Sequence, residues 1–113
     1  TMQGHWAWDF GDLVRSVTFS RGGFDALDYR ACAEGFIAGR GSEILEAKPL
    51  VEAPAYLAFM LGLRFLTDHI AGDRYFLVPE HGENLRRAAQ QFNLYQQFKS
   101  HRPVMADVVA QLF

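Results

Sequence analysis

The sequence contains a single cysteine, Cys32, and no long run of charge of one sign. One cysteine cannot form a disulfide within the chain, which excludes a disulfide-stapled secreted domain. The 11 basic and 13 acidic residues are dispersed and sum to −2, so the basic patch of a nucleic-acid-binding protein is missing. The same balance argues against attraction to an anionic membrane. Because no leader of the secretory kind is visible, we expect a cytoplasmic protein.

Histidine is also sparse, and its four copies, His5, His69, His81 and His101, are spread along the chain. None of them makes a zinc-type spacing with Cys32, so we expect no metal site. Cys32 has no histidine-bearing motif beside it. We therefore expect it to be a small buried side chain rather than a nucleophile.

Apolar and aromatic side chains, in contrast, are abundant. Half of the 113 residues are hydrophobic, and they include ten Phe, four Tyr and two Trp, which is ample for one core. The length suits a single domain, which we assign to residues 9–113. An N-terminal tail precedes it at residues 1–8, of which we expect residues 1–5 to be loosely held. Trp6 and Trp8 would be unusual in a free tail, so we expect them to pack on the domain or on another chain.

Apolar residues recur at spacings of three and four along most of the chain, which predicts helices. Glycine and proline separate the predicted segments, which are residues 9–17, 25–38, 42–71 (one bent helix or two), 84–100 and 103–113. Only residues 75–78 resemble a strand, and we expect extended linker there because Pro79 follows. The predicted fold class is all-α, with four to six helices in a bundle-like or orthogonal arrangement and no substantial sheet.

The longest apolar stretch lies within residues 53–75. Between residues 55 and 66 only Gly62 and Arg64 interrupt a series of aliphatic and aromatic side chains. A helix that is apolar nearly all round belongs in the interior of a protein. Because this run is shorter than the roughly 20 apolar residues needed to span a bilayer, we predict the central helix of a soluble domain.

Arg64 lies four residues before Asp68, and the two side chains therefore share one helical face. A guanidinium in so apolar a helix needs a partner. A structural ion pair with Asp68, or extension of the arginine to the helix end, is the simplest explanation, and ligand binding is the alternative. Gly72 is suited to end the helix, and Tyr75 follows just past that turn.

Asp9 and Asp12 precede and enter the first predicted helix. We expect them to cap it, because carboxylates accept hydrogen bonds from the free N–H groups of a first turn and favour its positive end. Two carboxylates three residues apart could also suggest a metal ion. No further ligand lies nearby in the sequence, so capping is the better interpretation.

Four motifs follow one another in order: WDFGDLVR at residues 8–15, GLRFLTDH at 62–69, GDRYF at 72–76 and NLRRA at 84–88. Together they resemble the C-terminal end of the aminoglycoside phosphotransferase and choline kinase-like superfamily. The resemblance is closest to the N-acetylhexosamine 1-kinase branch and extends from Trp8 to about Ser100. It implies a helical C-terminal subdomain of a protein-kinase-like fold.

In that family, the arginine matching Arg64 and the tyrosine matching Tyr75 line the sugar pocket. Planar donors and an aromatic face suit hydroxyl-rich ligands. Asp9 and Asp12 match the segment that follows the catalytic region, and the role that the resemblance implies for them is structural.

The motifs of phosphoryl transfer are not among these residues. That chemistry needs a glycine-rich nucleotide loop, a strand lysine, a base aspartate and a metal-binding aspartate. The triplet Asp9-Phe10-Gly11 spells the kinase metal motif, but it follows no predicted strand and no catalytic loop. We expect no kinase activity from this chain alone, and ATP and magnesium only together with a missing upstream lobe.

The leading hypothesis is a noncatalytic C-terminal domain or remnant of a sugar kinase that retains part of a hexosamine pocket. Two alternatives remain open. The chain could be a helical homodimeric interaction module that associates through an exposed apolar surface. It could also be a subunit that complements a separately encoded N-terminal kinase half.

Overall fold

The computed structural model describes residues 2–40, 46–73 and 80–113, with side chains from Trp6 onward in the first range. Within these ranges the chain forms five helices and no strand, which confirms the predicted all-α class. The strand-like segment at residues 75–78 and most of the helix start expected at residues 42–46 lie outside the described residues. The helices are α1 (Met2–Arg21), α2 (Ala26–Arg40), α3 (Lys48–Ile70), α4 (Glu83–Ser100) and α5 (Arg102–Leu112).

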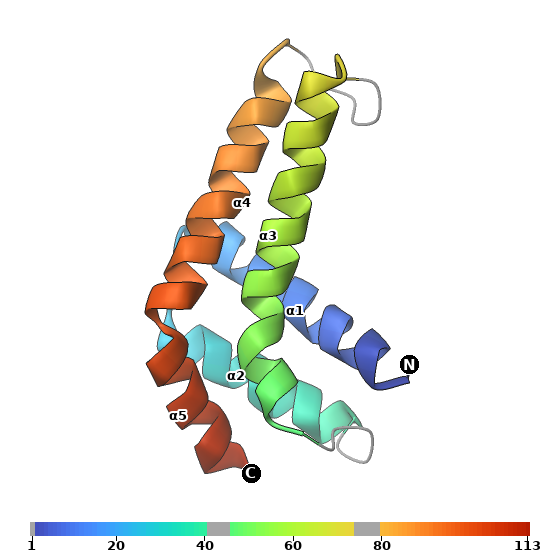
Figure 1. Ribbon diagram of the computed structural model, residues 1–113. Coiled ribbons are helices and arrows are strands. Elements are labelled where there is room, and N and C mark those ends of the chain that lie inside the picture. Colours follow the sequence, from blue (N-terminus) through green and yellow to red (C-terminus); the bar gives the residue numbers. More distant parts are fainter. Residues whose placement is uncertain (1, 41–45, 74–79) are drawn as a thin grey trace.

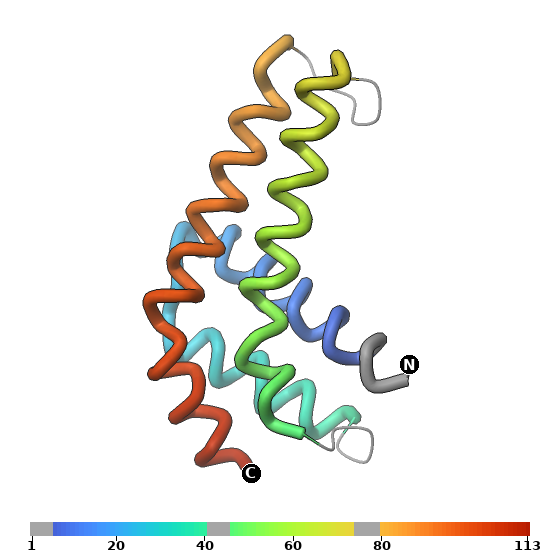
Figure 2. Tube along the Cα trace, in the orientation of Figure 1, coloured from blue at the N-terminus to red at the C-terminus, as the bar shows by residue number. Residues whose placement is uncertain are grey.

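Helices α3 and α4 lie side by side as an antiparallel pair and form the most extensive helix contact (Figure 1). Helix α1 crosses this pair, while α2 and α5 lie toward one end of it. The other end of the pair, where α3 finishes and α4 begins, projects beyond the remaining helices (Figure 2). The molecule is accordingly elongated, with extents of 45 × 28 × 18 Å.

Helix α1 begins at Met2, so the tail predicted at residues 1–8 is helical from its second residue. The physical reason is an apolar stripe that starts earlier than we predicted. Trp6, Phe10 and Val14, four residues apart, lie on one face and are all buried. Trp6 thus packs on the domain, whereas Trp8 is 59% exposed.

The close crossing of α1 over α3 depends on Gly11. A Cβ atom at this position would lie 2.8 Å from the backbone oxygen of Ala53, so the two helices approach closely only where α1 has no side chain. The triplet Asp9-Phe10-Gly11 lies inside a helix rather than after a strand. Its glycine therefore has a packing role, unlike that of a kinase metal motif.

Pro54 lies in the interior of α3, and residues 48–70 nevertheless form one helix. Proline has no N–H group, so the carbonyl of Leu50, one turn earlier, loses its usual helical donor. The hydroxyl of Tyr29 on α2 donates to this carbonyl at 2.7 Å inside the core. Burial raises the pKa of Tyr29, which keeps the hydroxyl protonated and able to donate.

Helix α3 has 23 residues, more than the apolar run at residues 55–66 suggested. It is therefore long and apolar enough to cross a membrane by length and composition, and our prediction that it is too short is wrong. The central helix of a soluble protein meets the same criteria. Here α3 packs against α1, α4 and α5, while 28% of its most apolar window is buried.

Two glycine substitutions test the crossing of α1 and α3. Gly11→Ala should lower the free energy of unfolding by about 1–3 kcal/mol, because the new methyl group overlaps the backbone of α3. Gly35→Ala, on α2 with open space around it, should raise that free energy by roughly 0.5–1 kcal/mol, because alanine favours the helix. Urea unfolding measures both. Equal effects of the two changes would contradict the close approach at Gly11.

Candidate functional site

A hollow of about 400 Å³ lies between α1 and α3. Its walls combine aromatic rings, apolar chains and charged groups within a small volume. Among the lining residues are Trp8, Asp12 and Arg15 from α1, and Tyr56, Met60 and Arg64 from α3. Guanidinium donors, a carboxylate and an exposed indole thus face one concave surface, an arrangement suited to a polar organic ligand.

The expected ion pair between Arg64 and Asp68 is not formed in the part of the chain that the structure describes. Arg64 is exposed at the hollow. Asp68 is only 5% exposed and accepts a hydrogen bond of 2.8 Å from the Nδ2 atom of Asn84 on α4. The pair fails because Asp68 is committed to the contact between α3 and α4, whereas the long arginine side chain reaches water.

Asp9 and Asp12 do not cap a helix, because α1 begins well before them. Asp12 accepts from Arg15 one turn later, with its Oδ1 atom 2.7 Å from Nη2 and 3.0 Å from Nε. Asp9 forms an ion pair of 3.3 Å with Arg40 at the end of α2. Both roles are structural, within α1 for Asp12 and between α1 and α2 for Asp9.

Tyr75 lies outside the described residues, so its predicted proximity to Arg64 stays a prediction. The structure brings Arg64 together with Asp12 in one hollow, and it adds Trp8 and Arg15. Sequence reasoning placed Trp8 in a tail and did not single out Arg15. The sequence would have placed Trp8 on α1 only if the start of that helix at Met2 had been predicted.

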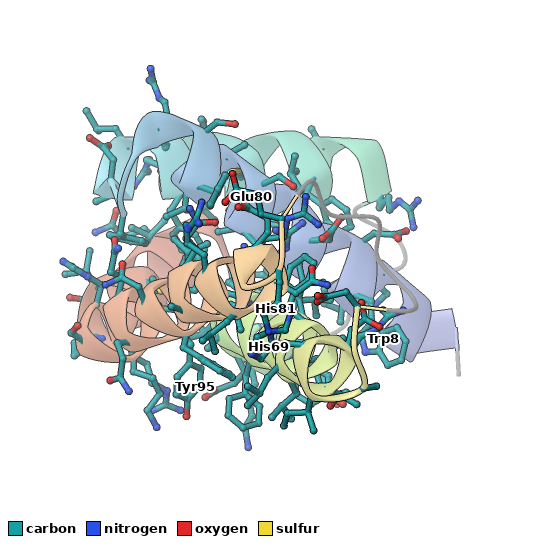
Figure 3. All side chains as sticks on the ribbon, turned by 90° about the horizontal axis from the view of Figure 1, so that it is seen from above. Trp8, His69, Glu80, His81 and Tyr95 are labelled. Atoms are coloured by element: carbon teal, nitrogen blue, oxygen red, sulfur yellow. The ribbon has the colours of Figure 1, made fainter. Side chains whose placement is uncertain are left out.

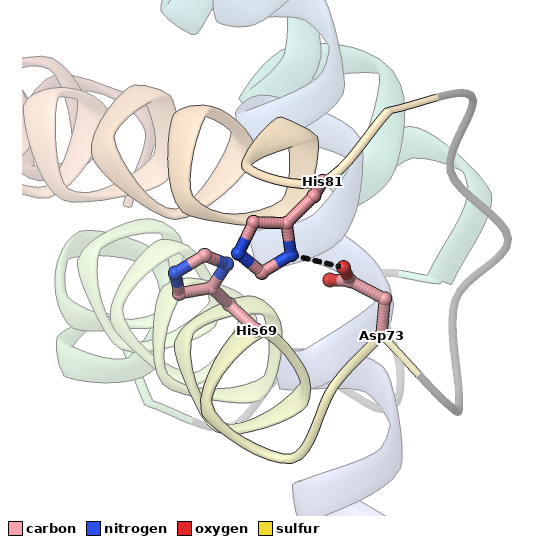
Figure 4. Close-up of side chains that lie close together, drawn as sticks. All are labelled: His69, Asp73 and His81. Atoms are coloured by element: carbon pink, nitrogen blue, oxygen red, sulfur yellow. Dashed lines mark hydrogen bonds and ion pairs between the residues drawn. The ribbon is translucent and has the colours of Figure 1, made fainter.

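A second cluster of functional groups lies at the projecting end of the α3–α4 pair. His69, Asp73 and His81 each offer one potential ligand atom, and these atoms all lie within 4.8 Å of one another. The two imidazole rings face each other, with centroids 5.0 Å apart and planes inclined by 28° (Figure 4). The Nδ1 atom of His81 lies 3.2 Å from the Oδ2 atom of Asp73.

Asn84 fixes the position of the Asp73 carboxylate in this cluster. Its side chain is fully buried, and its Nδ2 atom donates to Asp68 at 2.8 Å and to Asp73 at 3.1 Å. The backbone N–H of Asp73 donates to the carbonyl of Asp68 at 2.8 Å, which closes the end of α3. Asp73 adopts a φ of 63°, a left-handed conformation that aspartate tolerates better than most residues.

Sequence reasoning missed this cluster because it treated the histidines as scattered. Asp73 follows His69 by four residues across the end of α3, and the antiparallel return of the chain at the start of α4 brings His81 beside them. Cys32, by contrast, lies partly buried on α2, where burial raises the pKa of its thiol. That environment fits an unreactive packing residue.

The hollow and the histidine cluster are separate. Seen along the helix pair, His69 and His81 lie between α3 and α4, whereas Trp8 lies away from them on α1 (Figure 3). No family model matches the chain, and no solved structure matches it. The features that bear on function are therefore the hollow, the histidine cluster and the motifs in the sequence.

Proposed function

We propose that the chain is the C-terminal helical part of a sugar kinase of the aminoglycoside phosphotransferase and choline kinase-like superfamily, closest to N-acetylhexosamine 1-kinases. The hollow between α1 and α3 then forms part of the sugar pocket. The observation that carries this proposal is the position of Arg64. The arginine that the motifs single out lies in one hollow with Trp8 and Asp12, which belong to a different motif.

The groups in the hollow suit the chemistry of a hexosamine. An exposed indole offers an apolar face to the C–H groups of a sugar ring, and its N–H can donate a hydrogen bond. The Arg64 guanidinium presents planar donors to hydroxyl or amide oxygens. Asp12 accepts from Arg15 through Oδ1 and can accept from sugar hydroxyls as well.

This proposal assigns binding rather than catalysis to the chain. Kinase chemistry depends on positioned phosphates, magnesium and a base, and the motifs that supply them are not among these residues. ATP, magnesium and a cytoplasmic location belong to the proposed whole enzyme. Tight binding of ATP with magnesium by this chain alone, measured by calorimetry, would contradict the proposal.

Titration with N-acetylglucosamine, followed through the indole N–H signals in NMR spectra, tests the sugar pocket. Trp8 should shift progressively while the buried Trp6 stays unchanged and serves as an internal control. We expect weak binding, with Kd on the order of 1 mM or above, because the other half of the pocket is missing.

The matched variant for this titration is Arg64→Gln, which removes the charge from an exposed side chain and should abolish the Trp8 shift. Arg30→Gln, on α2 away from the hollow, should leave the shift intact. An unchanged Trp8 signal at saturating sugar in the wild-type protein, or a shift that survives Arg64→Gln, would contradict the proposed pocket.

A second candidate function is a homodimeric interaction module. Phe59, Met60 and Leu63 on α3 are each between 37% and 39% exposed and lie on adjoining turns, so they form a partly exposed apolar strip. Exposed apolar surface of this kind marks association sites. A symmetric dimer would cover the strip with the same strip of a second chain.

Sedimentation equilibrium tests the dimer over a range of protein concentrations. Leu63→Glu should weaken association by about 10-fold or more, because it places an unpaired charge in the interface. Leu27→Glu, on the exposed face of α2, should leave the oligomeric state unchanged. A wild-type protein that stays monomeric at high concentration would exclude this function.

A further inference from the structure

We propose that His69, Asp73 and His81 form a binding site for one divalent transition-metal ion, with Zn²⁺ as the best match. Two imidazoles and one carboxylate are ligands that Zn²⁺ prefers, whereas Ca²⁺ and Mg²⁺ favour sites made of oxygen alone. This site is independent of the proposed sugar pocket and uses none of its residues.

The separation of the ligand atoms is close to that of a metal site. Around a tetrahedral Zn²⁺ with bonds of about 2.0–2.2 Å, ligand atoms lie about 3.4 Å apart. The three side chains already lie within 4.8 Å of one another, and His81 and Asp73 approach to 3.2 Å. The side chain of His81 is 78% exposed just before α4, so its rotation can close the remaining distance.

A buried nitrogen in the cluster supports a ligand at this place. The Nδ1 atom of His69 is buried and forms no hydrogen bond within the described residues. Such a group is unfavourable in a folded protein because it has lost its hydrogen bonds to water. A metal ion bound to this nitrogen would supply the interaction that the protein does not.

The surroundings of the cluster resemble the outer shell of a metal site. A ligating carboxylate is usually held by a further hydrogen bond, and the buried Asn84 holds Asp73 in this way. Asn84 also donates to the carboxylate of Asp68, which ties this end of α4 to α3. Among the described residues, Arg87 brings a cation near the cluster, and its Nη1 atom donates to the side-chain Oδ1 atom of Asn84 at 3.3 Å.

The bound ion would connect the end of α3 to the start of α4. This end of the helix pair projects beyond the other three helices that the structure describes (Figure 2). With three protein ligands, a tetrahedral ion keeps one position for water or for a group from another molecule. Metal binding should therefore stabilise the folded protein and raise its melting temperature.

Calorimetric titration of Zn²⁺ into the protein, free of any histidine tag, tests the site. We expect one ion per chain, and at least ~10-fold weaker binding in His69→Gln, Asp73→Asn and His81→Gln. His81→Gln is the decisive variant because the side chain of His81 is 78% exposed and its replacement leaves the packed core unchanged. Co²⁺ should give a visible absorption spectrum that His81→Gln removes.

Two controls separate this site from other ligands in the chain. His101→Gln changes a histidine that stacks on Phe24, with centroids 4.5 Å apart, and Cys32→Ser removes the thiol. Both variants should bind Zn²⁺ as the wild type does, as should Arg64→Gln. No binding at about 1 mM Zn²⁺, or an equal loss of affinity in either control, would overturn the proposal.

Discussion

One buried hydrogen bond beside a proline joins α2 to the central helix α3. Pro54 removes a backbone donor from the middle of α3 and leaves the Leu50 carbonyl without its helical partner. The hydroxyl of Tyr29 replaces that donor at 2.7 Å, in a place that water does not reach. The carbonyl that lacks its helical donor because of Pro54 is therefore also the group through which α3 binds Tyr29 of α2.

The same stretch of α3 receives α1. Gly11 lies against the backbone of Ala53, the residue before Pro54, so α1 and α2 both meet α3 within one turn. Because Gly11 has no side chain, α1 can cross α3 in close contact at this point. Trp8, Asp12 and Arg15 face the next turns of α3 as a result, and the hollow exists because of that crossing.

Helical periodicity in the sequence indicates five helical segments, although α1 begins earlier than predicted, and it does not show which face of each helix is buried. The predicted helix at residues 84–100 matches α4 closely, since it forms from Glu83 to Ser100. Leu85, one of the apolar residues spaced by three and four in this segment, is 47% exposed, while the polar Gln91 is buried. Periodicity predicts that the helix is amphipathic. Which of its side chains are buried depends on the other helices that pack against it, and these are distant in the sequence.

The candidate sites show the same limit. Arg64 was identifiable because a charge within an apolar run is a local anomaly. Trp8, Asp12 and Arg15, which share the hollow with Arg64, come from another helix, and they meet α3 where Gly11 allows α1 to cross it closely. The histidine cluster forms because α4 runs antiparallel to α3 and brings His81 back beside His69. The spacing of the histidines in the sequence does not predict this return.

A double-mutant cycle between Tyr29 and Pro54 tests this account most directly. Tyr29→Phe should cost about 1–3 kcal/mol of unfolding free energy in the wild-type background, because it leaves the Leu50 carbonyl buried without a donor. In a Pro54→Ala background, α3 can supply its own N–H, so the same change should cost clearly less. An equal cost in both backgrounds would contradict the account.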